Sequence, residues 1–141
     1  PNDCYDEKTN HVIPALIQKF HNAKVNKSES VEVWGTGKPK REFLHVDDMA
    51  SGIMFLLDNY FDNTPINLGT GEEVTIKELA YLVSEVVNYK GNIVFDDSKP
   101  DGIPRKILDS SKILKLGWKP SISLLEGLER TYRIYLDNSD K

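Results

Sequence analysis

Two short stretches of the chain combine positive charge with glycine and proline, and such stretches can bind phosphate groups. The first is Trp-Gly-Thr-Gly-Lys-Pro-Lys-Arg, residues 34–41. Its glycines let the backbone approach a ligand closely, Arg41 can bind two oxygens of a diphosphate, and Trp34 offers a flat apolar face to a base or sugar. The alternative is a solvated turn beside a core tryptophan, and composition alone favours that alternative.

The second stretch is Lys-Pro-Asp-Gly-Ile-Pro-Arg-Lys, residues 99–106. Lys99, Arg105 and Lys106 are cationic donors, and Asp101 can accept a pair of ribose hydroxyls. Taken alone, an ordinary charged surface loop is the better interpretation. Two basic loops in a chain of net charge −4 nevertheless favour a local anion site.

The histidines suggest one candidate for proton transfer. His11 stands beside a loop and before a predicted helix, where an imidazole can act as a general acid, although a capping or surface histidine is the alternative. We expect His21 to be exposed and His45 to be a buried, hydrogen-bonded residue of a strand. The histidines and Cys4 lack the spacing of metal ligands, so no metal site is predicted.

Composition limits the class of protein. With 141 residues, 39% of them hydrophobic, the chain can build one domain with a core. The acidic balance argues against a nucleic-acid partner, and no apolar run is long enough for a membrane span. One cysteine cannot form an intrachain disulfide, which fits a reducing compartment and predicts a cytoplasmic protein. The chain begins with Pro1 and not with methionine, so we expect a segment upstream of it.

Periodic patterns predict alternating short strands and helices. Apolar residues at helical spacing predict helices over 13–23, from Asp47 or Asp48 to about 60, 76–87, 110–116 and 124–136. Strands are expected over 31–34, 42–46, 65–69 and 92–96. Thr75 with Glu78, and Ser123 with Glu126, match the capping box that begins a helix. The prediction is a single α/β domain over residues 1–141, with residues 1–10 as loop.

Two motifs of nicotinamide enzymes are missing from the sequence. No glycine-rich turn of the type Gly-x-Gly-x-x-Gly joins a strand to a helix, and this turn is what usually holds a dinucleotide. No tyrosine stands four residues before a lysine, since Tyr5 and Lys8 are one residue too close. The chain therefore has no means of its own to hold a nicotinamide cofactor or to transfer hydride.

Several of these segments together resemble a known class of enzymes. The strings Arg-Glu-Phe-Leu-His-Val-Asp-Asp-Met-Ala at 41–50, Asn-Leu-Gly-Thr-Gly at 67–71 and Leu-Gly-Trp-Lys-Pro at 116–120 resemble the extended short-chain dehydrogenases/reductases that modify nucleotide sugars. Within that class, segments 11–17, 33–37 and 99–106 are similar to the GDP-L-fucose synthase family. The likeness covers essentially the whole chain and implies the C-terminal substrate-binding domain, with the Rossmann half missing.

The resemblance also implies roles for single residues. His11 resembles the acid that protonates the sugar carbanion and lies near the nicotinamide. Lys19 stands where the family commonly carries an arginine that contacts the substrate. The implied contacts to the GDP-sugar are Lys19, Trp34, Arg41, Asp101 and Lys106. The tyrosine, lysine, serine and cysteine of the family's reaction are implied to lie upstream of this chain.

The implied activity of the intact protein is conversion of GDP-4-keto-6-deoxy-D-mannose to GDP-L-fucose. It combines 3,5-epimerisation with a 4-reduction by NADPH, with NADP bound mainly outside this chain and the protein as a homodimer. We expect the isolated 141 residues to be inactive. The alternatives are a related enzyme for a UDP- or dTDP-sugar, and a stand-alone nucleotide-binding module.

Overall fold

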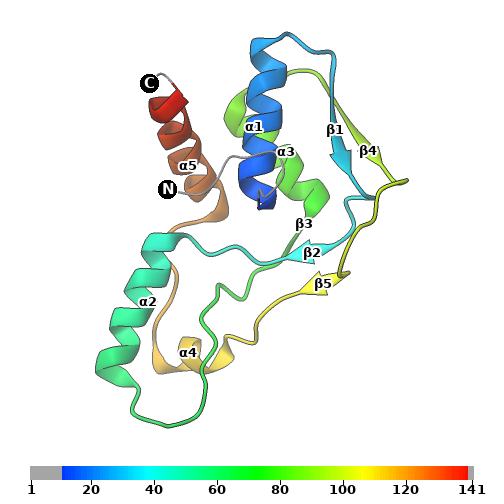
Figure 1. Cartoon of the computed structure of the whole chain (residues 1–141). Helices are drawn as coiled ribbons and strands as arrows, with labels where there is room; N and C mark the ends of the chain where they lie inside the picture. Colours follow the sequence, from blue (N-terminus) through cyan, green and yellow to red (C-terminus); the bar gives the residue numbers. More distant parts are fainter. Residues whose placement is uncertain (1–10, 140–141) are drawn as a thin grey trace.

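The computed structural model describes residues 11–139 and has the mixed α/β composition that the sequence predicts (Figure 1). The elements are α1 (Val12–Val25), β1 (Ser30–Trp34), β2 (Lys40–Arg41), α2 (Val46–Asn59), β3 (Val74–Thr75), α3 (Ile76–Val87), β4 (Asn92–Asp96), β5 (Arg105–Lys106), α4 (Ser111–Leu116) and α5 (Leu124–Ser139). The expected loop over residues 1–10 lies outside the described residues.

The core lies where α1, α3 and α5 pack together beside β1 (Figure 1). Apolar residues recur every three or four positions on each helix, and their side chains face the core. Phe20 from α1, Val83 from α3 and Leu128 from α5 are 0–2% exposed. Each such side chain contributes about 1.5–3 kcal/mol by leaving water, so this cluster forms the stable support of the molecule.

Helix α3 begins at the predicted capping box. The Thr75 hydroxyl accepts from the Glu78 backbone N–H at 3.1 Å, and the Glu78 carboxylate accepts from the Thr75 N–H at 2.8 Å. Asn88 ends the helix in the left-handed conformation with φ 58°. Both ends of α3 are therefore set by local sequence.

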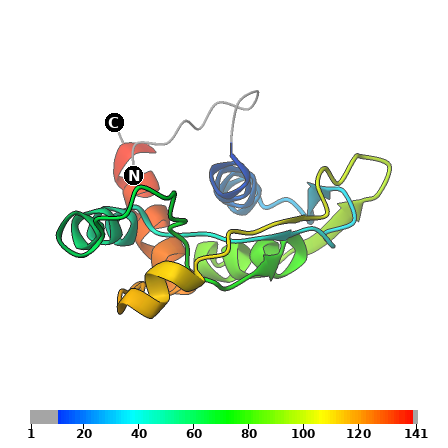
Figure 2. The same ribbon diagram turned by 90° about the horizontal axis from the view of Figure 1, so that it is seen from below.

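Two small sheets bring the basic stretches together. β1 pairs in parallel with β4, and β2 pairs in parallel with β5, so that Arg41 stands opposite Lys106. β3 pairs antiparallel with β2 on its other edge. Figure 2 shows β2 and β5 running side by side, with α1 on one side of them and α3 on the other. The segments that follow β1 and β4 are neighbours for the same reason.

Two predicted strands were wrong. Residues 42–46 form no strand: the strand β2 lies just before them, at Lys40–Arg41, and Val46 already belongs to α2. The predicted cap at Asp47 or Asp48 was also wrong, because His45 caps α2 by accepting from the Asp47 N–H at 3.2 Å. Residues 65–69 form no strand, since no other strand of the described part of the chain pairs with them. A strand is defined by that pairing, so β-prone residues alone do not make one.

Helix α2 has the predicted apolar face, but that face is largely exposed. Val46, Met49, Ile53 and Leu57 are 39–65% exposed. In Figure 1 the helix lies apart from the group formed by α1, α3 and α5. Its opposite side is held closely: a side chain at Gly52 would come within 2.5 Å of Leu68 and 3.2 Å of Trp118. Only glycine allows that approach.

Candidate functional site

An exposed tryptophan ring at the end of β1 has two lysines near it. The Trp34 side chain is 63% exposed, so the alternative of a core tryptophan was wrong, and the buried one is Trp118. The Lys19 ammonium, on α1, is 5.2 Å from the centre of the Trp34 ring, and the Lys99 ammonium is 5.8 Å from it. A cation over an indole face is attracted by the ring quadrupole. The ring therefore offers an apolar face with positive charge beside it.

A carboxylate joins the two basic stretches. Asp101 accepts from the Thr36 backbone N–H at 2.6 Å and from the Thr36 hydroxyl at 2.7 Å. Gly35, with φ +86°, makes the contact possible, because a β-carbon there would lie 2.4 Å from the Asp101 carboxylate. The Gly35 N–H also donates to the Asp96 carbonyl at 2.8 Å. The turn after β1 and the loop after β4 are thus held together at two points.

Arg41 and Lys106 are opposite each other on β2 and β5. Arg41 is half-buried and donates to the Lys40 carbonyl at 2.7 Å. A β-carbon at Gly102 would lie 3.9 Å from the Arg41 guanidinium, so this group reaches the loop that carries Asp101. The residues that these contacts link are Lys19, Trp34, Arg41, Asp101 and Lys106.

The charges around this group are not balanced. Glu73 binds Lys40 at 2.6 Å and Arg105 at 2.8 Å, and the bonds from Lys40 and Arg105 hold the pKa of the Glu73 carboxyl below its usual value. Within residues 11–139, no carboxylate forms an ion pair with the other cations of the two basic stretches or with the lysine of α1. These cations are Lys19, Lys38, Arg41, Lys99 and Lys106. A cluster of unneutralised cations attracts an anionic ligand even though the whole chain carries −4.

His11 is at the other end of α1. It is the exposed N-cap residue, and its side chain makes no capping hydrogen bond. Lys19 follows eight residues later, which is about 12 Å along a helix axis. Ile13 and Pro14, in the first turn after His11, line a hollow. The histidine is therefore separate from the cation cluster but is next to this hollow.

That hollow was missed by the sequence interpretation. Its volume is about 370 Å³, and its walls come from the starts of α1, α2 and α5. Residues that line it include Ile13, Phe43, His45, Ile122, Leu124 and Leu128. Residues 43–46 were interpreted as a strand, so their place between two helix starts was not foreseen. The hydrophobic run at that position was the available signal.

Comparison with known proteins shows what this chain is similar to. Residues 1–69 match the NAD dependent epimerase/dehydratase family. The chain is 56% identical over 138 residues to GDP-L-fucose synthase 1 of Arabidopsis thaliana and 47% identical over 150 to GDP-L-fucose synthase of Escherichia coli K12. The structure matches a GDP-L-fucose synthetase from Naegleria fowleri with a TM-score of 0.91, at 31% identity and over 100% of this chain.

In sequence and fold, the chain is similar to part of the extended short-chain dehydrogenases/reductases. It covers 43% of the Arabidopsis protein, 47% of the Escherichia coli protein and 44% of the Naegleria chain. The resemblance to the GDP-L-fucose synthase family is thus confirmed. So is the fold class, the C-terminal part of such a protein without its Rossmann half.

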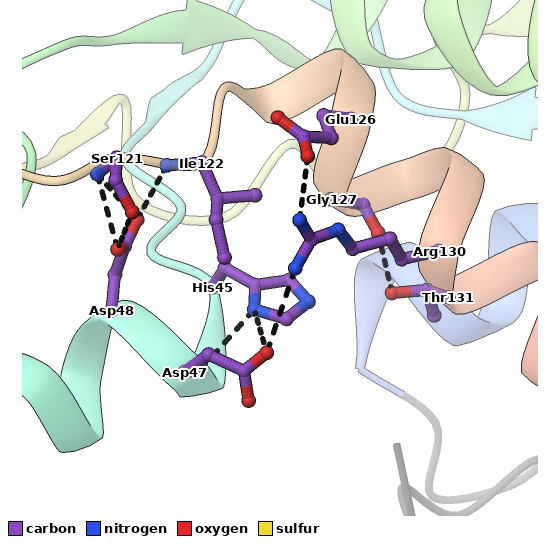
Figure 3. A network of polar contacts seen from close by, with 9 residues as sticks. All are labelled: His45, Asp47, Asp48, Ser121, Ile122, Glu126, Gly127, Arg130 and Thr131. Carbon is purple, nitrogen blue, oxygen red and sulfur yellow. Dashed lines mark hydrogen bonds and ion pairs between the residues drawn. The ribbon is translucent and has the colours of Figure 1, made fainter.

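A buried carboxylate, Asp48, holds the segment that lines the hollow at Ile122 (Figure 3). Asp48 is 2% exposed and accepts from the backbone N–H groups of Ser121 and Ile122 and from the Ser121 hydroxyl, at 2.8–3.1 Å. Burial is the largest single effect and would raise the pKa of Asp48. The hydrogen bonds from Ile122 and Ser121 together outweigh it, so the pKa lies below its usual value. Asp48 thereby joins α2 to the segment before α5.

The two other histidines serve structure. His21 was predicted to be exposed, but it is half-buried: its Nδ1 lies 3.1 Å from the Tyr132 hydroxyl, and its ring meets Tyr135 edge-on. The expectation was wrong because α5 packs against this side of α1. His45 is hydrogen-bonded and mostly buried, as predicted, but at a helix N-cap.

Neither a metal centre nor a membrane span was found in the part of the chain that the structure describes. Over residues 11–139, no three His, Cys, Asp or Glu side chains gather where they could hold a metal ion. Over the same residues, no helix is both long enough and apolar enough to cross a membrane. Cys4 lies outside the described residues.

Proposed function

We propose that this chain is the C-terminal, substrate-binding part of a GDP-L-fucose synthase. The intact enzyme would convert GDP-4-keto-6-deoxy-D-mannose to GDP-L-fucose by epimerisation at C3 and C5 and reduction at C4. The observation that carries the proposal is the exposed Trp34 ring among unpaired cations in an acidic chain. The names of the relatives at 47–56% identity point to the same substrate.

Each part of a GDP-sugar finds a matching group in this cluster. Lys19, Arg41 and Lys106 supply positive charge for the diphosphate, and the arginine can bind two oxygens at once. Trp34 offers its face to the base or sugar. A carboxylate has about four lone-pair sites. Asp101 can therefore accept a ribose hydroxyl without releasing Thr36.

His11 would supply a proton during epimerisation. The 4-keto group acidifies the C3 and C5 hydrogens of the sugar, so a base can remove each hydrogen and an acid on the opposite face can return one. The exposed position of His11 at the start of α1 suits that acid. The base would belong to the part of the relatives that this chain does not match.

NADP would be held outside the described residues. The turn after β1 leads into β2 and not into a helix, so β1 does not form the strand–turn–helix cradle that binds a dinucleotide. A separate nucleotide-binding domain would also account for the exposed apolar face of α2 and for the unpaired segment 65–69. We further propose that the intact protein is a cytoplasmic homodimer.

A chimaera tests the proposal. The part of Arabidopsis GDP-L-fucose synthase 1 that precedes the matched region is joined to this chain, and GDP-L-fucose formation is followed with NADPH. Deuterium uptake at C3 and C5 from heavy water reports epimerisation separately from reduction. We expect turnover, and we expect His11→Asn to slow deuterium uptake by about 10²–10⁴-fold.

His21→Asn is the matched control, because His21 packs against α5 and should be dispensable for the chemistry. Full deuterium uptake by the His11→Asn chimaera would show that His11 is not the acid of the epimerisation. Preference for a UDP-sugar or dTDP-sugar over the GDP-sugar would refute the proposed substrate. Activity of the 141-residue chain alone would refute the assignment of NADP to a missing part.

A further inference from the structure

Lys99 has the position of a ligand-binding residue, although the family resemblance gives it no role. Its ammonium lies 5.8 Å from the centre of the Trp34 ring, while that of Lys19 lies 5.2 Å from the same centre. Lys19 also donates to the Glu32 carbonyl at 3.1 Å, which is a neutral partner. Two like charges thus lie near one exposed ring, and an anion beside the ring would be attracted by both of them.

Asp96, the carboxylate whose pKa the Lys99 charge lowers, does not neutralise that lysine. Asp96 is close enough for its pKa to be lowered by the Lys99 charge, but the largest cause of that lowering is the hydrogen bond from Ser98. The Asp96 carboxylate accepts from the Ser98 N–H at 3.0 Å and from the Ser98 hydroxyl at 2.6 Å. No ion pair to Lys99 occurs within residues 11–139, so its charge remains available to a ligand.

The backbone around Lys99 is fixed on both sides. On one side, the Lys99 N–H donates to the Asp96 carbonyl at 3.2 Å, at the end of β4. On the other side, Asp101 binds the backbone N–H and hydroxyl of Thr36. Thr36 itself is steadied by the Lys38 N–H, which donates to its hydroxyl at 3.2 Å. Lys99 is therefore held beside Trp34 by the Thr36–Asp101 contact and does not swing on a free loop.

We propose that Lys99 binds the diphosphate of the sugar nucleotide and that Thr36 is the residue that positions it. This inference rests on the proposed function, of which it specifies one more binding residue. Lysine binds phosphate as a compact point charge, which suits a ligand whose oxygens rotate. Lys19 and Lys99 then approach the diphosphate from two separate elements, α1 and the loop after β4.

Calorimetric titration with inorganic pyrophosphate tests Lys99 without depending on the nucleotide. Lys99→Gln should weaken pyrophosphate binding by about fivefold, the upper end for one exposed ion pair, and the loss should shrink as salt is raised. Lys90→Gln is the matched control, because Lys90 is also exposed and its change removes the same charge from the turn between α3 and β4. It should bind pyrophosphate like the parent chain.

Equal weakening by both variants would refute the inference, because a general change of net charge would then explain it. Failure of the parent chain to bind pyrophosphate would refute it as well. The proposed function is tested separately by comparing GDP with UDP. If Lys99→Gln weakens pyrophosphate binding but UDP binds more tightly than GDP, the role of Lys99 is supported and the GDP-sugar substrate is refuted.

Thr36 is tested by a pair of substitutions. Thr36→Val removes the hydroxyl that donates to Asp101 and keeps the shape, and it should weaken pyrophosphate binding by about threefold. Thr36→Ser keeps the hydroxyl and should restore binding. In the Lys99→Gln background, Thr36→Val should have no further effect, because the residue it positions is gone. Additive losses in the double variant would refute the positioning role.

Discussion

Replacement of Asp48 by asparagine should destabilise the protein far more than the same change at its neighbour. Asp48 is 2% exposed, and its carboxylate receives the N–H groups of Ser121 and Ile122 and the Ser121 hydroxyl. Asparagine has the same shape but only one acceptor oxygen, and its NH₂ would face a backbone N–H. A hydrogen bond to a charged group contributes about 1.5–3 kcal/mol. Because the asparagine amide can replace only some of these bonds, we expect the free energy of unfolding to fall by about 3 kcal/mol.

The loss is large enough to measure by thermal unfolding. An unfolding entropy of about 2.1 cal/mol/K per residue gives about 0.3 kcal/mol/K for a chain of this length, so the Tm should fall by about 10 °C. Asp47→Asn is the matched control. The Asp47 side chain is 65% exposed, and its carboxylate lies 3.6 Å from Nδ1 of His45 and 3.7 Å from the guanidinium of Arg130, which is 44% exposed. Its loss should cost less than about 1 kcal/mol.

The difference between parent and Asp48→Asn should also depend on pH with a defined sign. The pKa of Asp48 is lower in the folded protein than the ordinary value of 3.8. The ionised carboxylate therefore stabilises the fold fully above pH 3.8, and this contribution disappears as the pH falls through the lowered folded value. The difference in Tm between the parent and Asp48→Asn should therefore shrink as the pH falls below 3.8. Equal Tm values for Asp48→Asn and Asp47→Asn at pH 7 would refute the reasoning.

Two further pairs of variants test the roles assigned to buried and exposed positions. Trp34→Ala should leave the Tm within about 2 °C of the parent value but should abolish binding of the base, measured with guanosine, which carries no phosphate. Trp118→Ala should lower the free energy of unfolding by about 3–5 kcal/mol, because Trp118 is 5% exposed. Gly35→Ala and Gly117→Ala both place alanine at a positive φ, and each should lower the free energy of unfolding by about 1–2 kcal/mol. Only Gly35→Ala should weaken pyrophosphate binding, because its β-carbon would displace Asp101, whereas a β-carbon at Gly117 meets nothing within 4 Å.

Features set by neighbours in sequence could be predicted. The capping box of Thr75 and Glu78 and the apolar stripe after it predicted α3, and the strand predicted over Asn92–Asp96 is β4 with the correct ends. The helix predicted over 110–116 is α4, and Gly117 ends it at φ 108°. These features depend on contacts within one helical turn or along one strand, so the sequence contains all that decides them.

The composition of the candidate site could be predicted only in part. The residue types in the two basic stretches pointed to an anion site, and the resemblance named its members. Their arrangement depends on contacts that are distant in sequence: Thr36 meets Asp101 65 residues later, and Asp48 meets Ser121 73 residues later. Lys99 was one donor among several until the structure placed it beside Trp34. No local pattern contains such information.

The exposed apolar face of α2 and the wrong strand prediction at residues 65–69 have a common physical cause. The sequence gives α2 an apolar stripe and gives segment 65–69 the residues of a strand, and both patterns describe groups that require a partner. In the described residues neither group has one, so the stripe is exposed and the segment is unpaired. Helix α2 is then held on its other side, by the close contact of Gly52 with Trp118 and by the bonds of Asp48 to Ser121. With so few contacts to replace it, the Asp48 carboxylate carries an unusually large share of the stability of this helix.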